Sequence, residues 1–375
     1  MTIGKLAPAR AGNQAAPASA ADLERERLLA AQAGLVVHPA ESLNCETPPA
    51  DLGGEVTPTA RFYRRSHFPI PLLDPAAWRL SVGGMVHQPL SLSLDELTQL
   101  PAETMTVTLE CAGNGRELFR PPTAGVQWGP GAVGTAEWTG PRLADVLARA
   151  GVRPGACEVI FGGADRGAVD GSHPVRFERS LPVRDALESD ALLAYAMNGQ
   201  PLPARHGYPL RLVVPGWYAV ASVKWLTDIR VAGEPFDGFF QAVHYVYDWD
   251  RGERDAPEAV REMQVRALIT RPGPGQELAA GGVIVRGVAW SGAAPIARVE
   301  VSVADGPWQK ARLAGVPAVH GWQQWEFLAS GLGPGEVCIR ARAADLAGRI
   351  QPEQPEWNRL GYGANFLHEV RALLR

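Results

Sequence analysis

The sequence predicts an α+β fold, in which a mixed region is followed by an all-β region. Strand-like and helix-like runs intermix from about Arg61 to Gly233, without the regular βαβ alternation of a doubly wound sheet. From about Val265 the pattern changes to alternating strands separated by glycine and proline turns, which is typical of an antiparallel sandwich of immunoglobulin type. The 32 prolines and 41 glycines among 375 residues favour many turns over long helices.

The mixed region contains runs with the periodicity of strands and runs with the periodicity of helices. Five runs predict strands, and they read WRLSVGG (78–84), TMTVTLEC (104–111), EVIFGGA (158–164), PLRLVVPG (209–216) and SVKWLTDIRVAG (222–233). Three runs predict helices, and they read SLDELTQL (93–100), RLADVLARAG (142–151) and LPVRDALES (181–189). Ser93 is placed to cap the first of these helices.

Three segments follow from these patterns. Residues 1–60 form an N-terminal extension that we expect to be partly disordered, with a short helix from Asp22 to Ala33 capped by Asp22. Residues 61–257 form the mixed domain and residues 258–375 the sandwich. In the sandwich the predicted strands lie in VRALITRP, GGVIVRGVAWSG, ARVEVSVADG, WQQWEFLA and EVCIRARAADLAG.

Composition and charge exclude several classes of protein. The net charge of −4 gives no global field that would attract nucleic acid or an acidic membrane surface. No segment is apolar for long enough to span a bilayer, and the N-terminus has no secretory or twin-arginine signal pattern. The four cysteines are scattered without CxxC spacing, which indicates neither a zinc site nor a disulfide framework. We therefore expect a cytoplasmic protein without nucleic-acid or membrane partners.

One cysteine stands out by its surroundings. TVTLECAGNGREL (106–118) places Cys111 between a strand-like run and a glycine-rich turn. Three interpretations are open. The thiol is a buried structural group, as free cysteines often are. It is a nucleophile that joins His206 and Asn114 in a Cys-His-Asn set, although no local protease signature is present. Or it is a thiolate ligand to a metal whose other ligands come from a cofactor.

The loop after Cys111 suits the third interpretation. Gly113 and Gly115 allow positive φ angles and a close approach of the backbone to a ligand. Asn114 can donate and accept hydrogen bonds locally. Arg116 can present a planar fork to an oxyanion beside the metal.

At this point several motifs together resemble the sulfite oxidase family of molybdopterin enzymes. TLECAGNGR resembles the family's molybdenum-cysteine motif, and FYRRSHFPIP (62–71) resembles its FxRNHxPxP pterin segment. The resemblance continues in order to the end of the chain, in GAVGTAEWTGPRLADVL (131–147), LLAYAMNGQPLPARHGYPLRLVVPGW (192–217), SVKWLTDIRV (222–231) and PEWNRLGYGANFLHEVR (355–371). It implies a mixed sulfite-oxidase-type molybdopterin domain and an immunoglobulin-like dimerisation domain. No His-Pro-Gly-Gly haem motif is present, so the resemblance implies molybdenum with molybdopterin and no haem.

The resemblance also implies roles for individual residues. Cys111 would ligate molybdenum, while Arg65, Arg116 and Trp128 would surround the substrate. The residues implied to bind the cofactor are Tyr63, Arg64, Arg65, Ser66, His67, Asp165, His206, Arg211, Ser222, Val223 and Lys224. A molybdopterin carries a phosphate and a polar pterin edge, which need cationic forks, a lysine point charge and backbone amides. Each match taken alone has a plainer alternative, such as a solvated basic run or a turn residue.

Three departures from the family pattern affect the substrate pocket. Sulfite-oxidising members have a third arginine in a WN-x-R-G motif, but here the motif reads WNRLG, with Leu360 at that position. The family's tyrosine position aligns with Phe177, and Ser66 replaces an asparagine. The sequence leaves open whether Arg176, Arg179 or Arg359 supplies the missing charge.

The sequence thus predicts a molybdenum-dependent oxidoreductase that transfers oxygen on a small-molecule substrate. Its partners would be an external electron carrier and a second copy of the chain in a homodimer. A true sulfite dehydrogenase with a rearranged anion pocket is the alternative within the family. A cofactor-free protein with a structural cysteine and a cysteine hydrolase are the alternatives outside it, and metal analysis separates both from the main interpretation.

Overall fold

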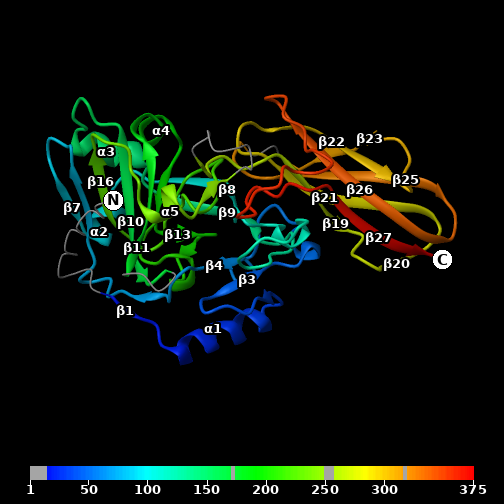
Figure 1. The fold of residues 1–375 in the computed structure, drawn as a ribbon, viewed down its shortest axis with the longest axis horizontal. Coiled ribbons are helices and arrows are strands. Elements are labelled where there is room, and N and C mark those ends of the chain that lie inside the picture. Colours follow the sequence, from blue (N-terminus) through cyan, green and yellow to red (C-terminus); the bar gives the residue numbers. More distant parts are fainter. Residues whose placement is uncertain (1–14, 170–173, 249–256, 316–318) are drawn as a thin grey trace.

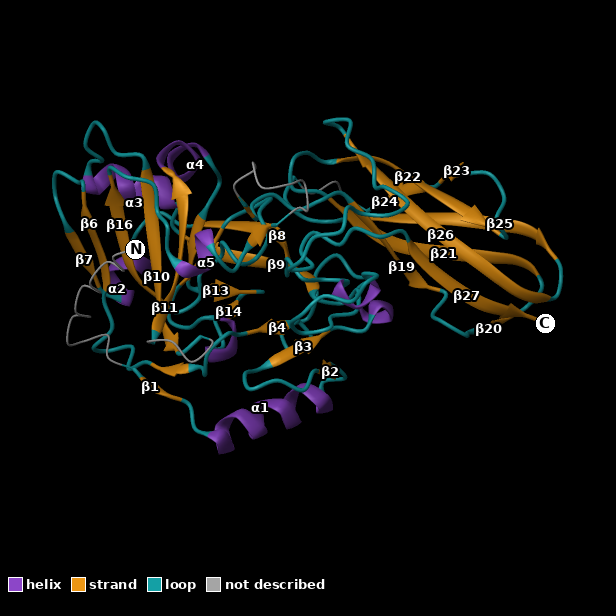
Figure 2. Cartoon of the chain, viewed as in Figure 1, coloured by secondary structure: helices purple, strands orange, loops and turns teal. Residues whose placement is uncertain are grey.

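A computed structural model describes residues 15–169, 174–248, 257–315 and 319–375. A larger mixed α+β part and an elongated β-sandwich lie side by side, as Figure 1 shows, with the short helices confined to the mixed part (Figure 2). This confirms the α+β fold class with its C-terminal all-β domain. None of the helices in the described residues has both the length and the apolar character that crossing a bilayer needs.

The largest sheet of the mixed part has the strand order β11-β10-β16-β6-β7. Strands β6 and β16 run parallel, and the other neighbours run antiparallel. The bounds are β6 Leu80–Gly84, β7 Leu90–Leu92, β10 Glu158–Gly167, β11 Val175–Pro182 and β16 Leu226–Ala232. One parallel pair in an otherwise antiparallel sheet explains why the sequence lacks regular βαβ alternation.

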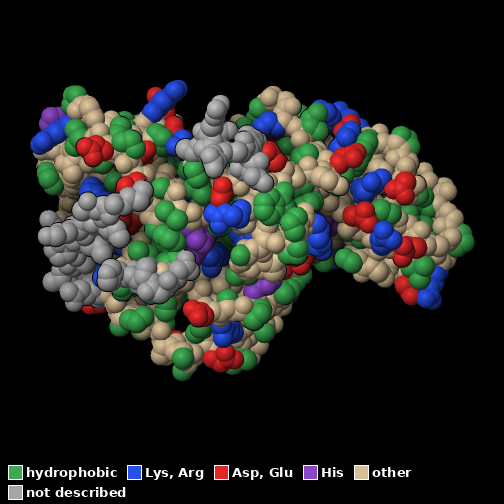
Figure 3. Space-filling model, viewed as in Figure 1, with side chains coloured by type: hydrophobic (Ala, Val, Ile, Leu, Met, Phe, Trp, Pro, Cys, Tyr) green, Lys and Arg blue, Asp and Glu red, His purple; other side chains and the backbone are tan. Residues whose placement is uncertain are grey.

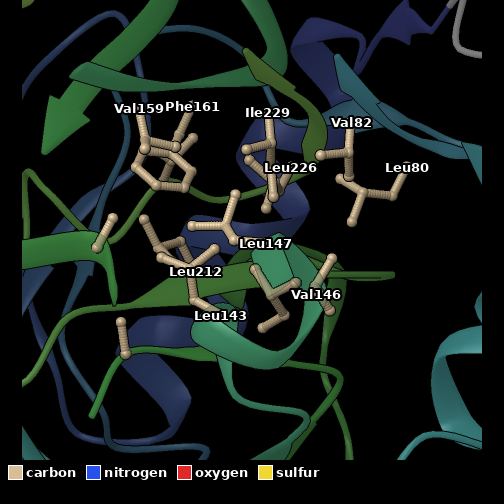
Figure 4. Close-up of a cluster of buried hydrophobic side chains, with 14 of the residues drawn as sticks. Leu80, Val82, Leu143, Val146, Leu147, Val159, Phe161, Leu212, Leu226 and Ile229 are labelled. Atoms are coloured by element: carbon tan, nitrogen blue, oxygen red, sulfur yellow. The ribbon is translucent and has the colours of Figure 1, made fainter. Parts of the chain in front are cut away.

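Short helices cover this sheet, and their bounds are α2 Leu94–Thr98, α3 Leu143–Ala150 and α4 Val183–Glu188. Ser93 caps α2 as expected, because its hydroxyl accepts from the Glu96 amide and the Glu96 carboxylate accepts from the Ser93 amide. Helix α3 ends at Gly151, whose φ of 67° suits a residue without Cβ. The apolar face of α3 packs against the sheet, where Figure 4 shows Leu143, Val146 and Leu147 directed toward Val159, Phe161, Leu226 and Ile229.

A second sheet, of order β14-β13-β9-β8, carries the chain to Cys111. The bounds are β8 Glu103–Glu110, β9 Val133–Gly140, β13 Ala196–Met197 and β14 Gln200–Pro201, while β12 Leu192–Ala194 pairs with β15 Arg211–Val213. Strand β8 is exposed at its start and buried from residue 107 to its end. It therefore delivers Cys111 to the interior of the molecule.

The N-terminal segment packs against the mixed part. Its helix α1 runs from Ala20 to Gln32 and is capped by Ser19 rather than by Asp22. Asp22 is the third helical residue of a reciprocal capping box, so the expected cap was wrong by one turn. The associated strands are β1 Ala16–Pro17, β2 Val36–Val37, β3 Asn44–Glu46, β4 Arg64–Arg65 and β5 Pro71–Leu72. Residues 1–14, where disorder was expected, lie outside the described residues.

The C-terminal part is a sandwich of two sheets, with orders β19-β21-β25-β24 and β20-β27-β26-β22-β23. The bounds are β19 Arg266–Arg271, β20 Glu277–Leu278, β21 Gly281–Trp290, β22 Ile296–Val303, β23 Gln309–Lys310, β24 Arg312–Ala314, β25 Gln323–Leu332, β26 Gly335–Asp345 and β27 His368–Leu374. Alternate residues point into one core between the sheets, as period-two patterning requires. On the face in Figure 3, acidic and basic side chains intersperse over this part without a patch of one sign.

The segment between the two parts is short and aromatic. It contains α5 Phe239–Ala242, β17 Val246–Tyr247 and β18 Glu258–Ala259. Its rings join a buried cluster that includes Phe68, Tyr218, Trp290 and Tyr362 from both parts of the chain. This cluster packs the two parts together beside the cysteine loop. Three 3₁₀ turns, Pro49–Asp51, Arg116–Leu118 and Ala204–His206, complete the described helices.

Candidate functional site

A pocket opens where β4, the end of β8 and the loop before β16 converge. It encloses about 690 Å³ of space outside protein atoms, including open solvent. The residues of the sequence prediction that line it are Tyr63, Arg64, Arg65, Ser66, His67, Cys111, Asp165, His206, Arg211, Ser222 and Lys224. These residues come from five separate stretches of the chain, so the fold brings together what the motif order predicted. Arg116, Trp128 and Val223 are not among its lining residues.

Cys111 is fixed at the base of the pocket by its own backbone. Its amide donates to the Ala132 carbonyl at 2.9 Å, and its carbonyl accepts from the Asn114 amide at 2.9 Å. Gly115 closes the turn with a φ of 81°. Burial raises the pKa of the thiol, and the nearby charges of Arg65 and Arg116 act against this rise. A metal bound at the sulfur would remove the proton outright.

The contacts of Asn114 and His206 do not form a Cys-His-Asn set. The side-chain Nδ2 of Asn114 donates to Glu110 Oε1 at 2.9 Å, and its Oδ1 accepts from the backbone amide of Ala132 at 3.0 Å. His206 directs Nε2 to the Thr59 carbonyl at 3.3 Å. Both side chains are engaged elsewhere, so the geometry favours the ligand interpretation of Cys111 over the nucleophile.

Arg65 is the centre of the pocket's polar contacts near Cys111. Its Nη1 donates to Asn44 Oδ1 at 3.0 Å and to the Ser66 carbonyl at 2.7 Å. Its Nη2 lies 3.0 Å from both ring nitrogens of His67. Burial, followed by the charge of Arg65, lowers the pKa of His67 well below its usual range. His67 is therefore neutral at pH 7 and leaves the positive charge on Arg65.

Tyr245 is a site residue that the sequence reasoning missed. Its hydroxyl lies 2.7 Å from His67 Nε2, and its ring stacks on Tyr362 at 4.9 Å between centroids. It lines the pocket and is buried. The sequence comparison aligned the tyrosine position with Phe177, whose ring instead stacks on His67 at 5.7 Å. The pocket therefore does contain a tyrosine hydroxyl, and it comes from the connecting segment. The aromatic run HYVYDWD (244–250) is the feature of the sequence that could have pointed to it.

The far end of the pocket is cationic. Lys224 Nζ donates to the Arg65 carbonyl and to Ser66 Oγ, both at 2.9 Å. Arg211 donates to the carbonyls of His206 at 3.0 Å and Ser222 at 3.2 Å. Val223 sits between these residues in sequence, but its side chain belongs to the apolar core of the largest sheet. A role for Val223 toward a cofactor is thereby limited to its backbone.

One buried acid faces this cationic end. Burial raises the pKa of Asp165, and the charges of Lys224 and Arg176 act against the rise. Burial lowers the pKa of Lys224, and the carboxylate of Asp165 acts against that fall. The acid and the lysine therefore stabilise each other's charged forms, and the pocket offers an acceptor beside its donors.

Several polar atoms of this end have no protein partner within the described residues. They are Asp165 Oδ1 and the Nε atoms of Arg64, Arg205 and Arg211, all on residues that line the pocket. Buried polar atoms in folded proteins almost always have a partner. Arginine Nε atoms outside the pocket also lack partners, so these four atoms count only together with the cationic lining, and that combination suits a polar ligand with an anionic group and a hydrogen-bonding edge. Molybdopterin has this chemistry, so the residues present fit the group.

No cluster of three or more His, Cys, Asp or Glu side chains in the described residues could hold a metal ion. A metal at Cys111 would therefore need most of its ligands from a cofactor, which a lone thiolate beside a cationic pocket permits. The pocket thus provides for both parts of a molybdenum cofactor: one thiolate for the metal and a polar cradle for the pterin.

Arg116 is outside the pocket lining and is enclosed by glycines. A Cβ added at Gly113, Gly125 or Gly361 would lie 2.8 to 3.1 Å from its side chain, so these glycines make room for it. Its guanidinium donates to the carbonyls of Val126 at 3.0 Å and Leu360 at 3.1 Å. Trp128 is also buried, with its ring 4.7 Å from that of His38. Neither side chain is in the pocket lining, although the charge of Arg116 acts on the Cys111 thiol, so their predicted role around the substrate stays a prediction.

The three arginines that the sequence offers as replacements for the missing one make their contacts outside the pocket. Arg176 donates to the Gly162 carbonyl at 2.9 Å, and Arg179 to the carbonyls of Phe240 and Val260. Arg359 pairs with Asp248 at 2.6 Å and is 64% exposed. None of the three lines the pocket. Arg205, which no motif singled out, does line it.

Helix α1 reaches the rim of the same pocket. Glu26 Oε2 lies 3.3 Å from Arg64 Nη1 and 3.8 Å from Arg205 Nη1. The Glu26 carbonyl accepts from Arg64 Nη1 at 3.0 Å. A carboxylate of the N-terminal segment therefore holds two pocket arginines from outside.

Comparison with known proteins agrees with this geometry. Residues 67–240 match the oxidoreductase molybdopterin binding domain, and residues 257–374 match the Mo-co oxidoreductase dimerisation domain. The chain is 38% identical to mitochondrial sulfite oxidase of Macaca fascicularis, over 90% of this chain and 67% of that protein. It is 33% identical to sulfite oxidase of Arabidopsis thaliana, over 90% and 93%.

Among solved structures, the sulfane dehydrogenase SoxCD from Paracoccus pantotrophus matches with a TM-score of 0.79 and 27% identity, covering 90% of this chain and 88% of that one. The chain spans about two thirds of the length of the mammalian relatives that it matches.

The fold and the pocket define a molybdenum-cofactor-dependent oxidoreductase. The chain belongs to the sulfite oxidase family of molybdopterin-dependent oxidoreductases.

Proposed function

We propose that this protein catalyses a two-electron oxygen-atom transfer on a small sulfur compound. The observation that carries the proposal is the pocket itself, in which Cys111 shares the lining with Arg65, Tyr245 and three arginines whose Nε atoms have no protein partner. When bound, the cofactor supplies a metal that exchanges an oxygen atom and two electrons with the substrate. Cys111 would hold the metal, and Arg64, Arg205, Arg211, Lys224 and Asp165 would hold the pterin and its phosphate.

The protein's own groups perform three tasks near Cys111. Arg65 provides a fixed positive charge for an anionic or polar sulfur substrate, since its guanidinium is braced by Asn44 and His67. The Tyr245 hydroxyl supplies a second hydrogen-bonding group, oriented by neutral His67. Tyr245 is buried and Arg65 is half-buried, so the site is partly shielded from water, which strengthens these interactions.

For the substrate we propose a sulfur compound that carries less negative charge than sulfite. Leu360 stands where the family's third arginine is expected, and Arg116, which is outside the pocket lining, donates to two backbone carbonyls. With one charged fork lining the pocket near Cys111, a doubly charged anion would be bound weakly. A sulfane sulfur compound fits this chemistry, and a structural relative is a sulfane dehydrogenase. Sulfite itself is the second candidate, supported by sulfite oxidases that are 38% identical.

We further propose that electrons leave through a separate carrier and that the protein acts as a homodimer. Support comes from the two matched domains, one for molybdopterin binding and one for dimerisation. The second match supports a homodimer, in which a stable contact should bury upwards of about 1,000 Å². Light scattering at micromolar concentration tests this, because a monomer would contradict it. A cytoplasmic location stays a prediction from the sequence.

The function is tested on protein made in a host that supplies molybdopterin. We expect about one molybdenum per chain, since Cys111 offers one thiolate to one metal. Assays with sulfite, a sulfane compound of low charge such as an alkyl persulfide, a sulfoxide, an N-oxide and nitrate should show turnover of a sulfur compound with an artificial electron acceptor or donor. A low micromolar KM for sulfite would instead support the second candidate, in which sulfite is the substrate. Protein without molybdenum and without redox turnover would overturn the proposal.

A further inference from the structure

A buried carboxylate sits directly before Cys111 and belongs to none of the pocket's tasks. Glu110 ends β8 and is 2% exposed. Its Oε1 accepts from Asn114 Nδ2 at 2.9 Å and from Arg266 Nη1 at 3.1 Å. Its Oε2 accepts from Trp290 Nε1 at 2.8 Å. Both carboxylate oxygens are therefore satisfied, and two of the three donors lie outside the mixed domain.

Arg266 and Trp290 come from the sandwich. Arg266 starts β19, Trp290 ends β21, and the two residues are paired in the antiparallel register of these strands. Their side chains leave the sheet at the end that faces the mixed part and are almost completely buried. A charge placed there needs a partner, and Glu110 is that partner.

The sandwich and the residues near it contact the cysteine loop, residues 110–115, at further points. Arg266 Nη1 also lies 3.2 Å from the Asn114 carbonyl, which it can contact as a donor. A Cβ on Gly115 would lie 2.9 Å from Arg266 Nη2, so glycine is needed for the guanidinium to fit. On the other side of the loop, the Gly363 amide donates to the Ala112 carbonyl at 2.9 Å. Residues 110–115 are thus held from both sides by residues that follow position 257.

We propose that the C-terminal sandwich positions the metal ligand, through a brace formed by Glu110, Arg266 and Trp290. The brace fixes the backbone on which Cys111 sits, so the domain whose matched role is dimerisation also sets the geometry at the molybdenum site. Glu110, Arg266 and Trp290 are positioning residues, because they act through the loop and touch neither substrate nor cofactor. The proposal rests on Cys111 being the metal ligand, as the proposed function has it.

Charge and distance select this brace over simple packing. An apolar contact would hold the loop without direction, whereas a carboxylate with a donor on each oxygen fixes both the position and the rotation of the residue before the ligand. Removing one donor leaves a buried carboxylate oxygen without a hydrogen bond, which is costly, so opening of the loop to solvent becomes more favourable. Weakening the brace should therefore change the exposure of Cys111 more than it changes the stability of the whole fold.

The first experiment uses cofactor-free protein and measures the rate at which a thiol reagent modifies Cys111. Cys157 is exposed and serves as the internal reference. Trp290→Phe keeps the ring and removes one donor, and Arg266→Lys keeps the charge but loses the fork. We expect each variant to raise the Cys111 rate roughly tenfold over the Cys157 rate, the factor that a lost hydrogen bond to a charged group supplies. The double variant Glu110→Gln with Arg266→Met, which removes both charges, should raise it at least as much.

A matched control removes a buried acid from the same sandwich whose side-chain hydrogen bonds go to Ser291 and Arg349 and not to the cysteine loop. Asp345 is 3% exposed and accepts from Arg349 Nε at 2.9 Å. Asp345→Asn should lower the melting temperature and leave the Cys111 rate unchanged. If the brace variants behave like Asp345→Asn, melting earlier with parental labelling of Cys111, the brace is merely structural and the proposal is overturned.

The second experiment uses the loaded enzyme. Trp290→Phe should change the electron paramagnetic resonance signal of the reduced metal and lower kcat while KM stays within about twofold, because substrate contacts are untouched. An unchanged signal with unchanged kcat would contradict the proposal. The two experiments separate two failures. If no variant and not even the parent binds molybdenum, the proposed function fails, while the thiol labelling still decides whether the sandwich holds the Cys111 loop.

Discussion

The two ends of the pocket differ in how their polar groups are satisfied. Near Cys111, Arg65, His67 and Tyr245 are bonded to each other and to the protein. At the far end, Arg64, Arg205 and Arg211 keep Nε atoms without a protein partner, and so does Asp165 with Oδ1. The side chains near Cys111 are therefore held by protein contacts alone, while the cofactor end leaves polar atoms that a ligand can contact.

This difference separates two kinds of mutational effect. A group whose hydrogen bonds are complete in the free protein loses orientation or substrate contact when changed, and cofactor content is unaffected. A group that waits for a ligand should affect cofactor content first, because buried polar atoms left unpaired are costly. Variants at each end therefore test the comparison directly.

The largest effect is expected where the two ends meet. Cys111→Ser replaces sulfur by oxygen in a nearly isosteric side chain and should abolish turnover with the fold intact. Activity, molybdenum content and circular dichroism measure the three quantities. Cys45→Ser is the control, because Cys45 is also buried but lies on β3 outside the pocket lining. Full activity in Cys111→Ser would refute the ligand assignment.

Arg211→Ala tests the cofactor end. Arg211 is buried, donates to two carbonyls and lies 4.7 Å from the Trp138 ring, so its loss should cost about 1–3 kcal/mol of folding stability. We expect the molybdenum and pterin content to fall by a larger factor than this stability loss explains. Arg359→Ala, which removes an exposed arginine paired with Asp248, is the control. Full cofactor content with only earlier melting would make Arg211 structural.

Tyr245→Phe tests the substrate end. Loss of the hydroxyl removes the hydrogen bond to His67 and a contact available to the substrate, so kcat/KM should fall roughly tenfold to a hundredfold. Molybdenum content should not change. Tyr218→Phe removes a buried hydroxyl that bonds the Gln264 amide instead, and it should leave kcat/KM near the parental value. A loss of metal in Tyr245→Phe would break the division between the two ends.

Much of the fold and part of the site were predictable from the sequence, because the motifs that indicate them are local. The α+β class, the capped helix at Ser93 and the position of Cys111 after a buried strand follow from short-range patterns. Tyr245 did not follow, since the connecting segment has no regular period and its aromatic residues reach the pocket only when both domains pack together. The brace on Glu110 was hidden for the same reason, with its partners 156 and 180 positions away.

Contacts also decided which arginines serve the pocket. Arg116 follows the cysteine in sequence, yet its side chain lies among glycines 113, 125 and 361 and is outside the pocket lining. Arg205 belongs to the family-like stretch 192–217 but was assigned no role, and the turn that also carries His206 places it in the lining. Side-chain direction depends on such tertiary contacts, and residue type alone does not supply them.

Leu360→Arg sharpens the comparison at the substrate end. Leu360 packs with the aromatic cluster that contains Tyr245 and Tyr362, so a guanidinium there can extend toward the pocket. One charge-assisted hydrogen bond to sulfite is worth about 1.5–3 kcal/mol, and we expect kcat/KM for sulfite to rise by roughly one decade. Leu346→Arg, at an exposed position of the sandwich, is the control. No gain for sulfite, with the fold intact, would contradict the pocket reading.

The smallest effect is expected at the rim, where helix α1 meets the cofactor end. Glu26 lies 3.3 Å from Arg64 and 3.8 Å from Arg205, and its side chain is 24% exposed, so solvent weakens the pairing. Glu26→Gln removes the charge but keeps the backbone contact to Arg64. If the carboxylate steadies these arginines around the pterin, cofactor loss during dialysis should quicken about twofold to fivefold, in line with about 0.2–1 kcal/mol for a partly exposed ion pair. Glu24→Gln changes an exposed acid on the same helix and should have no effect. Slower cofactor loss in Glu26→Gln would mean that the carboxylate competes with the cofactor's anionic group for the two arginines, and the rim would then work against the cofactor end rather than for it.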